Sequence, residues 1–215
     1  YHILDELSDR KIPYLVIEPA KGEYKTKFND AQVFGTNPNN GRLLKLNPFA
    51  FPKEIHVQEH IDRLAELFNV CWVMYAAMPA VLKDSIIRAY ESAGWNNSIN
   101  TVNDGLFPTF EDVLREIDVV IHESDYSGDT SSDYRGALKT RLRSLTNGIN
   151  GMIFSSREVS NKELFDSKTI VDLSRVGSTE TKSLMMGVLV LKLQEYRMAT
   201  HKETDSNLSH ITVLE

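Results

Sequence analysis

Apolar residues recur along this chain in two patterns, one typical of buried strands and one typical of helices. The run Ile12–Glu18 is short, rich in β-branched and aromatic residues, and ends in an acid followed by Pro19. Such a run is typical of a strand that is buried on both faces of a parallel sheet. Residues 1–11 place their apolar side chains on one helical face. A helix that leads directly into such a strand is half of a βαβ unit.

The buried-strand pattern returns near the C-terminus. Lys168–Ser174 and His210–Glu215 are further apolar runs with polar ends, and residues 178–198 between them have helical spacing. Alternating strands and helices at both ends of the chain predict one α/β core with a parallel sheet. Two more short candidate strands flank the turn-forming residues 37–41, and this arrangement predicts a hairpin.

The middle of the chain has helical spacing almost throughout. Apolar residues between 56 and 94 recur in steps of three and four, which predicts one helix continuing to Met78 and a second that begins at Pro79. Thr109 is the predicted N-cap of a third helix, and residues 134–147 form a fourth, basic one. The sequence therefore predicts a partial parallel-sheet core, residues 1–54 and 151–215, interrupted by a mostly helical insertion over residues 55–150.

Composition excludes several classes of protein. Hydrophobic residues make up 41% and charged residues 25% of the 215 residues, as in an ordinary globular protein. The formal net charge of −6 gives no overall electrostatic argument for nucleic-acid binding. No apolar run approaches the roughly 20 residues of a membrane span. The single cysteine, Cys71, can form no intramolecular disulfide, which favours a reducing cytoplasm.

Polar residues follow each of the three predicted strands, and the carboxyl ends of parallel strands meet at one edge, where ligands bind. The residues expected to converge there are Glu18, Lys21, Glu23, Asp172, Ser174, Arg175 and Glu215. A buried strand that ends in an acid has the Walker B form, in which the acid holds the Mg²⁺ of a bound nucleotide. No G-x-x-x-x-G-K-[ST] phosphate loop occurs in the sequence. Spacing alone thus predicts only an α/β domain with an acidic cleft at its strand ends.

Three of these segments together resemble a known family. "EPAKGEYK" (18–25), "VDLSRVGS" (171–178) and "ITVLE" (211–215), in this order, are similar to the corresponding segments of the HerA/FtsK-like P-loop ATPases. The resemblance implies a RecA/FtsK-like core that uses ATP and Mg²⁺. It also implies a cytoplasmic homo-oligomer, a hexameric ring that translocates duplex DNA and often works with a nuclease.

The resemblance also implies roles for single residues. Glu215 corresponds to the first Walker B acid, which holds Mg²⁺ and its water. The nucleotide-cleft candidates are Glu18, Lys21, Glu23, Ser174 and Arg175. The alternative for Lys21 and Glu23 is an ordinary solvated turn, and the alternative for Ser174 and Arg175 is a helix-capping loop with a surface arginine.

The family's Walker A loop would precede Tyr1, and its second Walker B acid would follow Glu215. The sequence is therefore expected to be an internal fragment that binds no ATP or Mg²⁺ by itself and hydrolyses ATP poorly or not at all.

The basic helix carries a second group of candidates. Its cations could reach the phosphate of a neighbouring subunit or contact DNA backbone, and the alternative is a solvated charged face. These residues are Arg135, Lys139, Arg141 and Arg143.

Two further hypotheses belong to other classes. The helical insertion could be a non-catalytic docking or regulatory module of an ATPase. Residues 56–60, "HVQEH", match the H-x-x-E-H pattern of some zinc hydrolases, with His56, Glu59 and His60 as the residues concerned. This pattern is short enough to arise by chance, and no third ligand is evident in the sequence.

Overall fold

The computed structural model describes residues 1–100, 106–124, 128–200 and 208–215, with side chains from 131 onward in the third range. The chain divides into two compact units. The first, here called the sheet unit, comprises Tyr1–Leu46 and Arg157–Glu215, and the second, the helical unit, comprises Asn47–Ser156. The predicted division lay at 54/55 and 150/151.

The difference in boundaries has a packing cause. Phe49 packs edge-on against Phe110, with ring centroids 5.1 Å apart, and Phe154 packs against the same ring at 5.2 Å. Both flanking aromatic residues therefore belong to the core of the helical unit.

The sheet unit is built on five parallel strands in the order β3-β2-β4-β1-β5. This observation confirms the predicted α/β class and the three predicted strands, of which β1 and β4 are buried as expected, whereas β5 is only partly buried. The strands are β1 (Tyr14–Glu18), β2 (Gln32–Gly35), β3 (Arg42–Leu43), β4 (Lys168–Asp172) and β5 (Ile211–Leu214).

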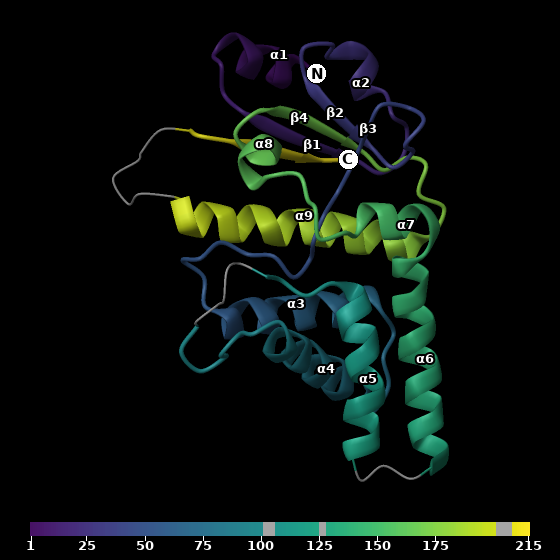
Figure 1. Cartoon of the computed structure of the whole chain (residues 1–215). Coiled ribbons are helices and arrows are strands. Elements are labelled where there is room, and N and C mark those ends of the chain that lie inside the picture. The colour runs from purple at the N-terminus through teal and green to yellow at the C-terminus, as the bar shows by residue number, and fades with distance from the viewer. Residues whose placement is uncertain (101–105, 125–127, 201–207) are drawn as a thin grey trace. The chain divides into compact units, whose positions relative to one another are not determined.

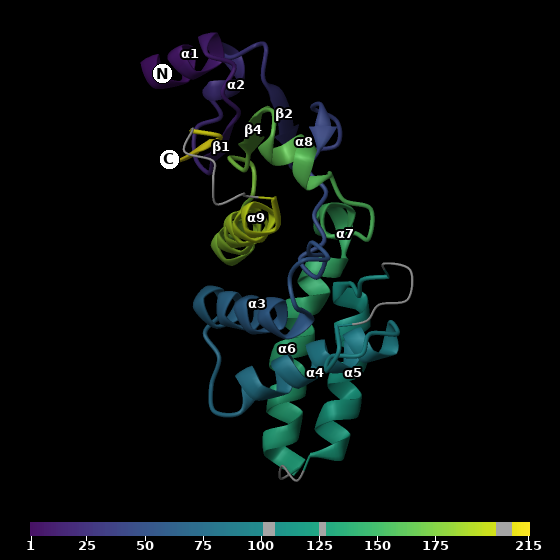
Figure 2. The same ribbon diagram turned by 90° about the vertical axis from the view of Figure 1, so that its left-hand side faces the viewer.

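Helices cover both faces of this sheet. Figures 1 and 2 show α1 (His2–Asp9) and α2 (Tyr24–Lys27) on one side and α9 (Thr179–Thr200) on the other. The short α8 (Asn161–Phe165) precedes β4. Helices α2 and α8 were not predicted, because four or five residues are too few to show helical periodicity.

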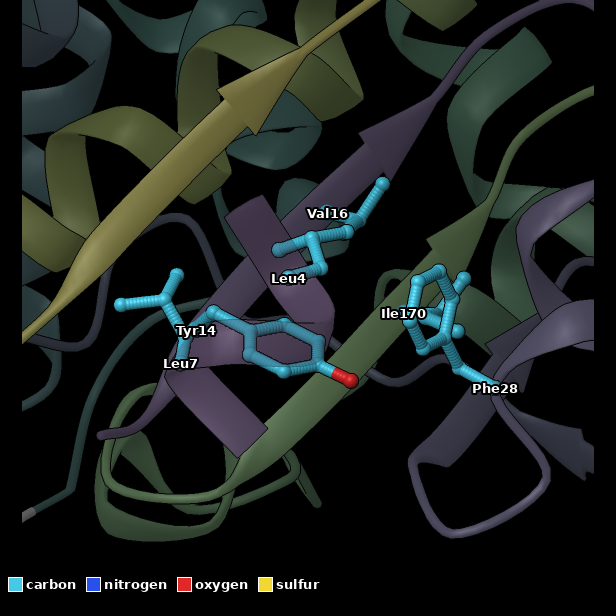
Figure 3. Close-up of a cluster of buried hydrophobic side chains, with 6 residues drawn as sticks. All are labelled: Leu4, Leu7, Tyr14, Val16, Phe28 and Ile170. Carbon is cyan, nitrogen blue, oxygen red and sulfur yellow. The ribbon is translucent and has the colours of Figure 1, made fainter. Parts of the chain in front are cut away.

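The side chains of β1 point alternately to the two faces of the sheet, and both faces are covered, which explains why the strand is apolar throughout. Tyr14 and Val16 lie in a cluster with Leu4 and Leu7 of α1, which Figure 3 shows together with Phe28 and Ile170. Leu15 and Ile17, which point to the opposite face, are also fully buried. The strand is therefore buried on both sides, as its continuous apolar run predicts.

The predicted hairpin between the second and third strands is wrong, because β2 and β3 pair in parallel, with Phe34 opposite Arg42. The chain turns back before β3 begins: Asn37 accepts a hydrogen bond from the Asn39 amide, and Gly41 has a φ of 109°. The connecting residues therefore form a return loop and not a two-residue reversal.

The helical unit contains two pairs of longer helices. Helix α5 is capped by Thr109, as predicted, through a capping box with Asp112. The first predicted helix was expected to continue to Met78, but α3 ends at Cys71. In Figure 2, α5 and α6 run side by side. The helices are α3 (Val57–Cys71), α4 (Met78–Ser92), α5 (Phe110–Glu123), α6 (Gly128–Thr146) and α7 (Gly148–Ile153).

Among the residues that the structure describes, no helix combines the length and the apolar character needed to cross a bilayer.

Candidate functional site

Three acids lie side by side at the carboxyl edge of the sheet. Glu18 ends β1 and is the register partner of Asp172, which ends β4. Glu215 directly follows β5, and its amide lies 3.4 Å from the carbonyl oxygen of Ile17 in β1. Because β4, β1 and β5 are neighbours in the sheet, these acids form one row.

Glu18 is completely buried, and its carboxylate is used within the protein. It accepts hydrogen bonds from the backbone amides of Glu23 (2.5 Å) and Tyr24 (3.3 Å), at the start of α2. A carboxylate at a helix start satisfies amides that have no partner inside the helix. Glu18 therefore fixes the turn after β1 instead of presenting an oxygen to a ligand.

Asp172 is also buried, and it forms an ion pair with Lys25, whose ammonium donates to Oδ2 at 2.6 Å. The amide and the hydroxyl of Ser174 both donate to Oδ1, at 2.9 and 2.5 Å. Burial alone raises the pKa of Asp172, but the hydrogen bonds from Lys25 and Ser174 outweigh it and hold that pKa below its ordinary value. Asp172 is therefore an anion that orients its two neighbours.

Gly22 allows the turn to lie directly over this group. Its φ is 73°, and a Cβ built on it would lie 3.3 Å from the Ser174 hydroxyl and 3.4 Å from both the Asp172 carboxylate and the Lys25 ammonium. A larger residue would be strained by its backbone and crowded by its neighbours.

Glu215 is the most accessible acid of the row. Its side chain is 31% exposed, and its nearest cation among the described residues is the ammonium of Lys21, at 3.9 Å. This distance is beyond hydrogen-bonding range, so the pair is loose. Glu215 therefore keeps a carboxylate that a ligand at this edge could reach.

The predicted residues of this edge do gather there, although in unequal roles. Glu23 accepts a hydrogen bond from the Tyr1 hydroxyl at 3.1 Å. Arg175 follows Ser174 on an exposed loop and forms no ion pair with the described residues. Sequence reasoning missed Lys25, and it also missed Lys182, whose ammonium donates to the carbonyl oxygen of Pro19 at 2.7 Å.

The residues at this edge fit a magnesium-nucleotide only in a limited way. Within the described ranges, no three His, Cys, Asp or Glu side chains lie close enough to hold a metal among themselves. Mg²⁺ commonly needs only one or two carboxylates, with phosphate oxygens and waters completing its coordination. Glu215 fits this single-carboxylate role, whereas the buried Glu18 and Asp172 do not.

The residues of the H-x-x-E-H pattern lie in the helical unit and make structural contacts. His56 is the N-cap of α3, and its Nδ1 accepts a hydrogen bond from the Gln58 amide. His60 is fully buried, with its ring stacked on Phe51 and its Nε2 3.1 Å from the carbonyl oxygen of Pro48. Glu59 pairs with Arg63 at 3.0 Å.

The four basic residues of α6 have different surroundings. Arg135 and Lys139 both pair with Asp118 of α5, at 3.3 and 2.5 Å. Arg141 donates to the carbonyl oxygen of Val73 at 3.0 Å. Arg143 is exposed and forms no ion pair with the residues that the structure describes. The predicted basic face therefore leaves Arg143 as its most available cation.

Comparison with known proteins supports the fold. No family model matches the sequence, and no curated protein matches it. The chain is similar to the solved structure of VirB4 of Thermoanaerobacter pseudethanolicus, with a TM-score of 0.67 and 17% identity over 100% of this chain and 79% of that chain. The chain therefore shares the α/β fold of that structure. At this identity the similarity concerns the fold alone, and it does not distinguish the HerA/FtsK group from other proteins with such a core.

The contact between Lys25 and Asp172 gives a direct prediction. Replacing Lys25 with methionine is expected to raise the pKa of Asp172, because the carboxylate stays buried and loses its strongest hydrogen bond. Carboxyl-carbon NMR titration of the chain measures this shift. Lys27→Met is the matched control, since the Lys27 ammonium lies over the Tyr1 ring, 5.5 Å from its centroid. Equal titration of Asp172 in both variants would contradict the assigned pair.

Proposed function

We propose that this chain is part of an ATP-binding and ATP-hydrolysing protein of the HerA/FtsK type, and that the carboxyl edge of its sheet contributes to the nucleotide site. The observation that carries the proposal is the position of Glu215, a partly exposed acid at the end of a strand in a parallel, P-loop ATPase-like sheet. The ordered segments resembling "GEY", "VDLS" and Walker B support it from the sequence.

In this proposal two residues of the edge contact the ligand and two others support the turn beside them. Glu215 holds Mg²⁺, directly or through water, and Lys21 places a positive charge beside it. Glu18 and Asp172 do not contact the ligand; they fix the turn that carries Lys21. Bound Mg-ATP supplies the phosphoryl group and the divalent charge. The sequence has no G-x-x-x-x-G-K-[ST], so the proposal requires a phosphate loop from residues outside it.

The wider activity is proposed by family resemblance. We infer a cytoplasmic homo-oligomeric ring, hexameric in the family, that moves duplex DNA and can work with a nuclease. Arg143 of α6 is the candidate for a phosphate or DNA contact, because Arg135, Lys139 and Arg141 have other partners.

ATP hydrolysis by the natural full-length protein, with and without duplex DNA, tests this function. We expect DNA to stimulate hydrolysis, and Glu215→Gln to lower the rate by about tenfold at unchanged folding, because an amide holds a divalent cation less well than a carboxylate. Glu6→Gln is the control, since Glu6 pairs with Arg10 on the exposed surface of α1. Full-length protein that hydrolyses no ATP would refute the proposal.

A docking role for the helical unit is the second candidate function. The last turn of α3 and the loop after it expose Val70, Val73 and Tyr75, at 76%, 60% and 69% of their surfaces. Exposed apolar groups in one segment are typical of contact surfaces. If docking were the only role, the unmodified full-length protein would hydrolyse no ATP. The double substitution Val73→Ser and Tyr75→Ser would then abolish its assembly.

A further inference from the structure

The segment Lys21–Lys25 crosses the ends of three neighbouring strands and provides a partner for each terminal acid. Glu18 receives the amides of Glu23 and Tyr24, and Asp172 receives the ammonium of Lys25. Among the residues that the structure describes, Glu215 has one cationic partner, Lys21, at 3.9 Å. Two of the three contacts are thus short and involve buried carboxylates, whereas the third is long and partly exposed.

We propose that Lys21 is an exchangeable counter-ion of Glu215, which leaves this carboxylate when a divalent cation binds there and then pairs with the phosphates of the nucleotide. This inference rests on the proposed function and specifies how the charge of that site is regulated. Lys21 was a cleft candidate from the sequence, but the pairing with Glu215 and the exchange follow from the structure.

Charge and exposure favour the exchange. The Lys21 side chain is 62% exposed, and exposed ion pairs of this kind contribute little stability, so Lys21 can leave at low cost. A divalent cation at Glu215 would lie within a few ångströms of the Lys21 ammonium and repel it. Phosphate oxygens are a strong alternative partner for an ammonium group.

The contacts of the surrounding turn hold its backbone in place, so the exchange involves only the Lys21 side chain. Gly22 packs over the Asp172 group, Lys25 anchors α2 to β4, and Glu18 holds the amides at the start of α2. These contacts fix the backbone on the C-terminal side of Lys21. Its flexible stem can therefore move without any change in the strand ends.

The exchange predicts opposite effects of one substitution on two ligands. In the natural full-length protein, Lys21→Met is expected to bind Mn²⁺ alone about threefold more tightly, because a competing cation is gone. The same variant is expected to bind Mg-ATP about tenfold more weakly, because a phosphate partner is gone. Electron paramagnetic resonance measures Mn²⁺ binding, and calorimetry measures Mg-ATP binding.

Matched variants separate this role from simple support of the fold. Lys21→Arg keeps the charge and should keep both affinities within about twofold, and Lys27→Met should change neither. In a Glu215→Gln background, Lys21→Met should no longer affect Mn²⁺ binding. Affinities that change in the same direction, or do not change, overturn the exchange while leaving the proposed function intact. Wild-type protein that binds no Mg-ATP overturns both.

Discussion

Replacing Gly151 with alanine is expected to destabilise the helical unit by about 3 kcal/mol. A Cβ at this position would lie 2.2 Å from the carbonyl oxygen of Thr146 and 2.7 Å from its carbonyl carbon. These are backbone atoms, so no side-chain rotation can relieve the overlap. Two hydrogen bonds hold the turn between α6 and α7: Gly151 donates to the Asn147 carbonyl at 3.1 Å, and Asn150 to that of Ser144 at 2.9 Å. Alanine must break this geometry.

The unit offers a direct probe of this loss. Both tryptophans, Trp72 and Trp95, are nearly buried within it, so the urea dependence of tryptophan fluorescence reports its unfolding. Gly136→Ala is the control, because Gly136 lies in α6 and, beyond its neighbours and the backbone of its own helix, no described atom would come within 4 Å of its Cβ. That substitution is expected to stabilise the helix by roughly 0.5–1 kcal/mol. Equal free energies of unfolding for the two variants would show that the α6–α7 turn is not constrained as described.

The parts of the fold that the sequence predicted are those in which local pattern and burial agree. β1 and β4 were predicted because strands buried on both faces are apolar throughout. β5 was predicted from the same kind of apolar run, although its residues are only partly buried. The start of α5 was predicted because Thr109 and the acids of the first turn act within a few residues of each other. The direction of β3 was not predicted. Arg42–Leu43 pairs in parallel with β2 because the loop between the two strands returns along the sheet, and the geometry of that loop depends on Gly41.

The candidate site was predictable as a place but not as a set of contacts. Parallel strands bring their carboxyl ends together, so the convergence of Glu18, Asp172 and Glu215 followed from topology. Which lysine pairs with which acid depends on strand order: Lys25 and Asp172 are 147 residues apart and meet because β1 lies beside β4. The burial of Glu18, which removes it from the possible ligands, likewise appears only in three dimensions.

Acid is expected to destabilise the sheet unit through His210, the residue that precedes β5. Its Nδ1 lies 2.8 Å from the carbonyl oxygen of Phe165, which only accepts, so Nδ1 carries the proton and Nε2 accepts from the Thr212 hydroxyl at 2.9 Å. Burial and then the nearby Arg197 lower the pKa of His210 from 6.5 to about 4, against the smaller opposing effects of the Phe165 carbonyl and Asp166. The neutral ring is therefore the form that the folded protein holds.

The sign of the pH dependence follows from this depressed pKa. Above pH 6.5 the ring is neutral in both states, and its contribution is complete. As the pH falls from 6.5 toward 4, the unfolded chain binds a proton that the folded protein does not, so stability decreases. The expected loss is roughly 2 kcal/mol, after allowance for solvent screening of this half-buried ring.

Comparison with His210→Gln isolates this residue, because other titrating groups contribute alike to both proteins. A glutamine amide can donate to the Phe165 carbonyl but gains no charge in acid, so the variant should be the less stable protein at pH 7.5 and lose less stability below pH 6.5. Urea titrations followed by the NMR signals of Val16 and Ile170 report on the sheet unit, where no tryptophan lies. Parallel losses in the two proteins would exclude His210 as the cause. If the difference appears, the N-terminal end of the strand that leads to Glu215 depends on a neutral ring.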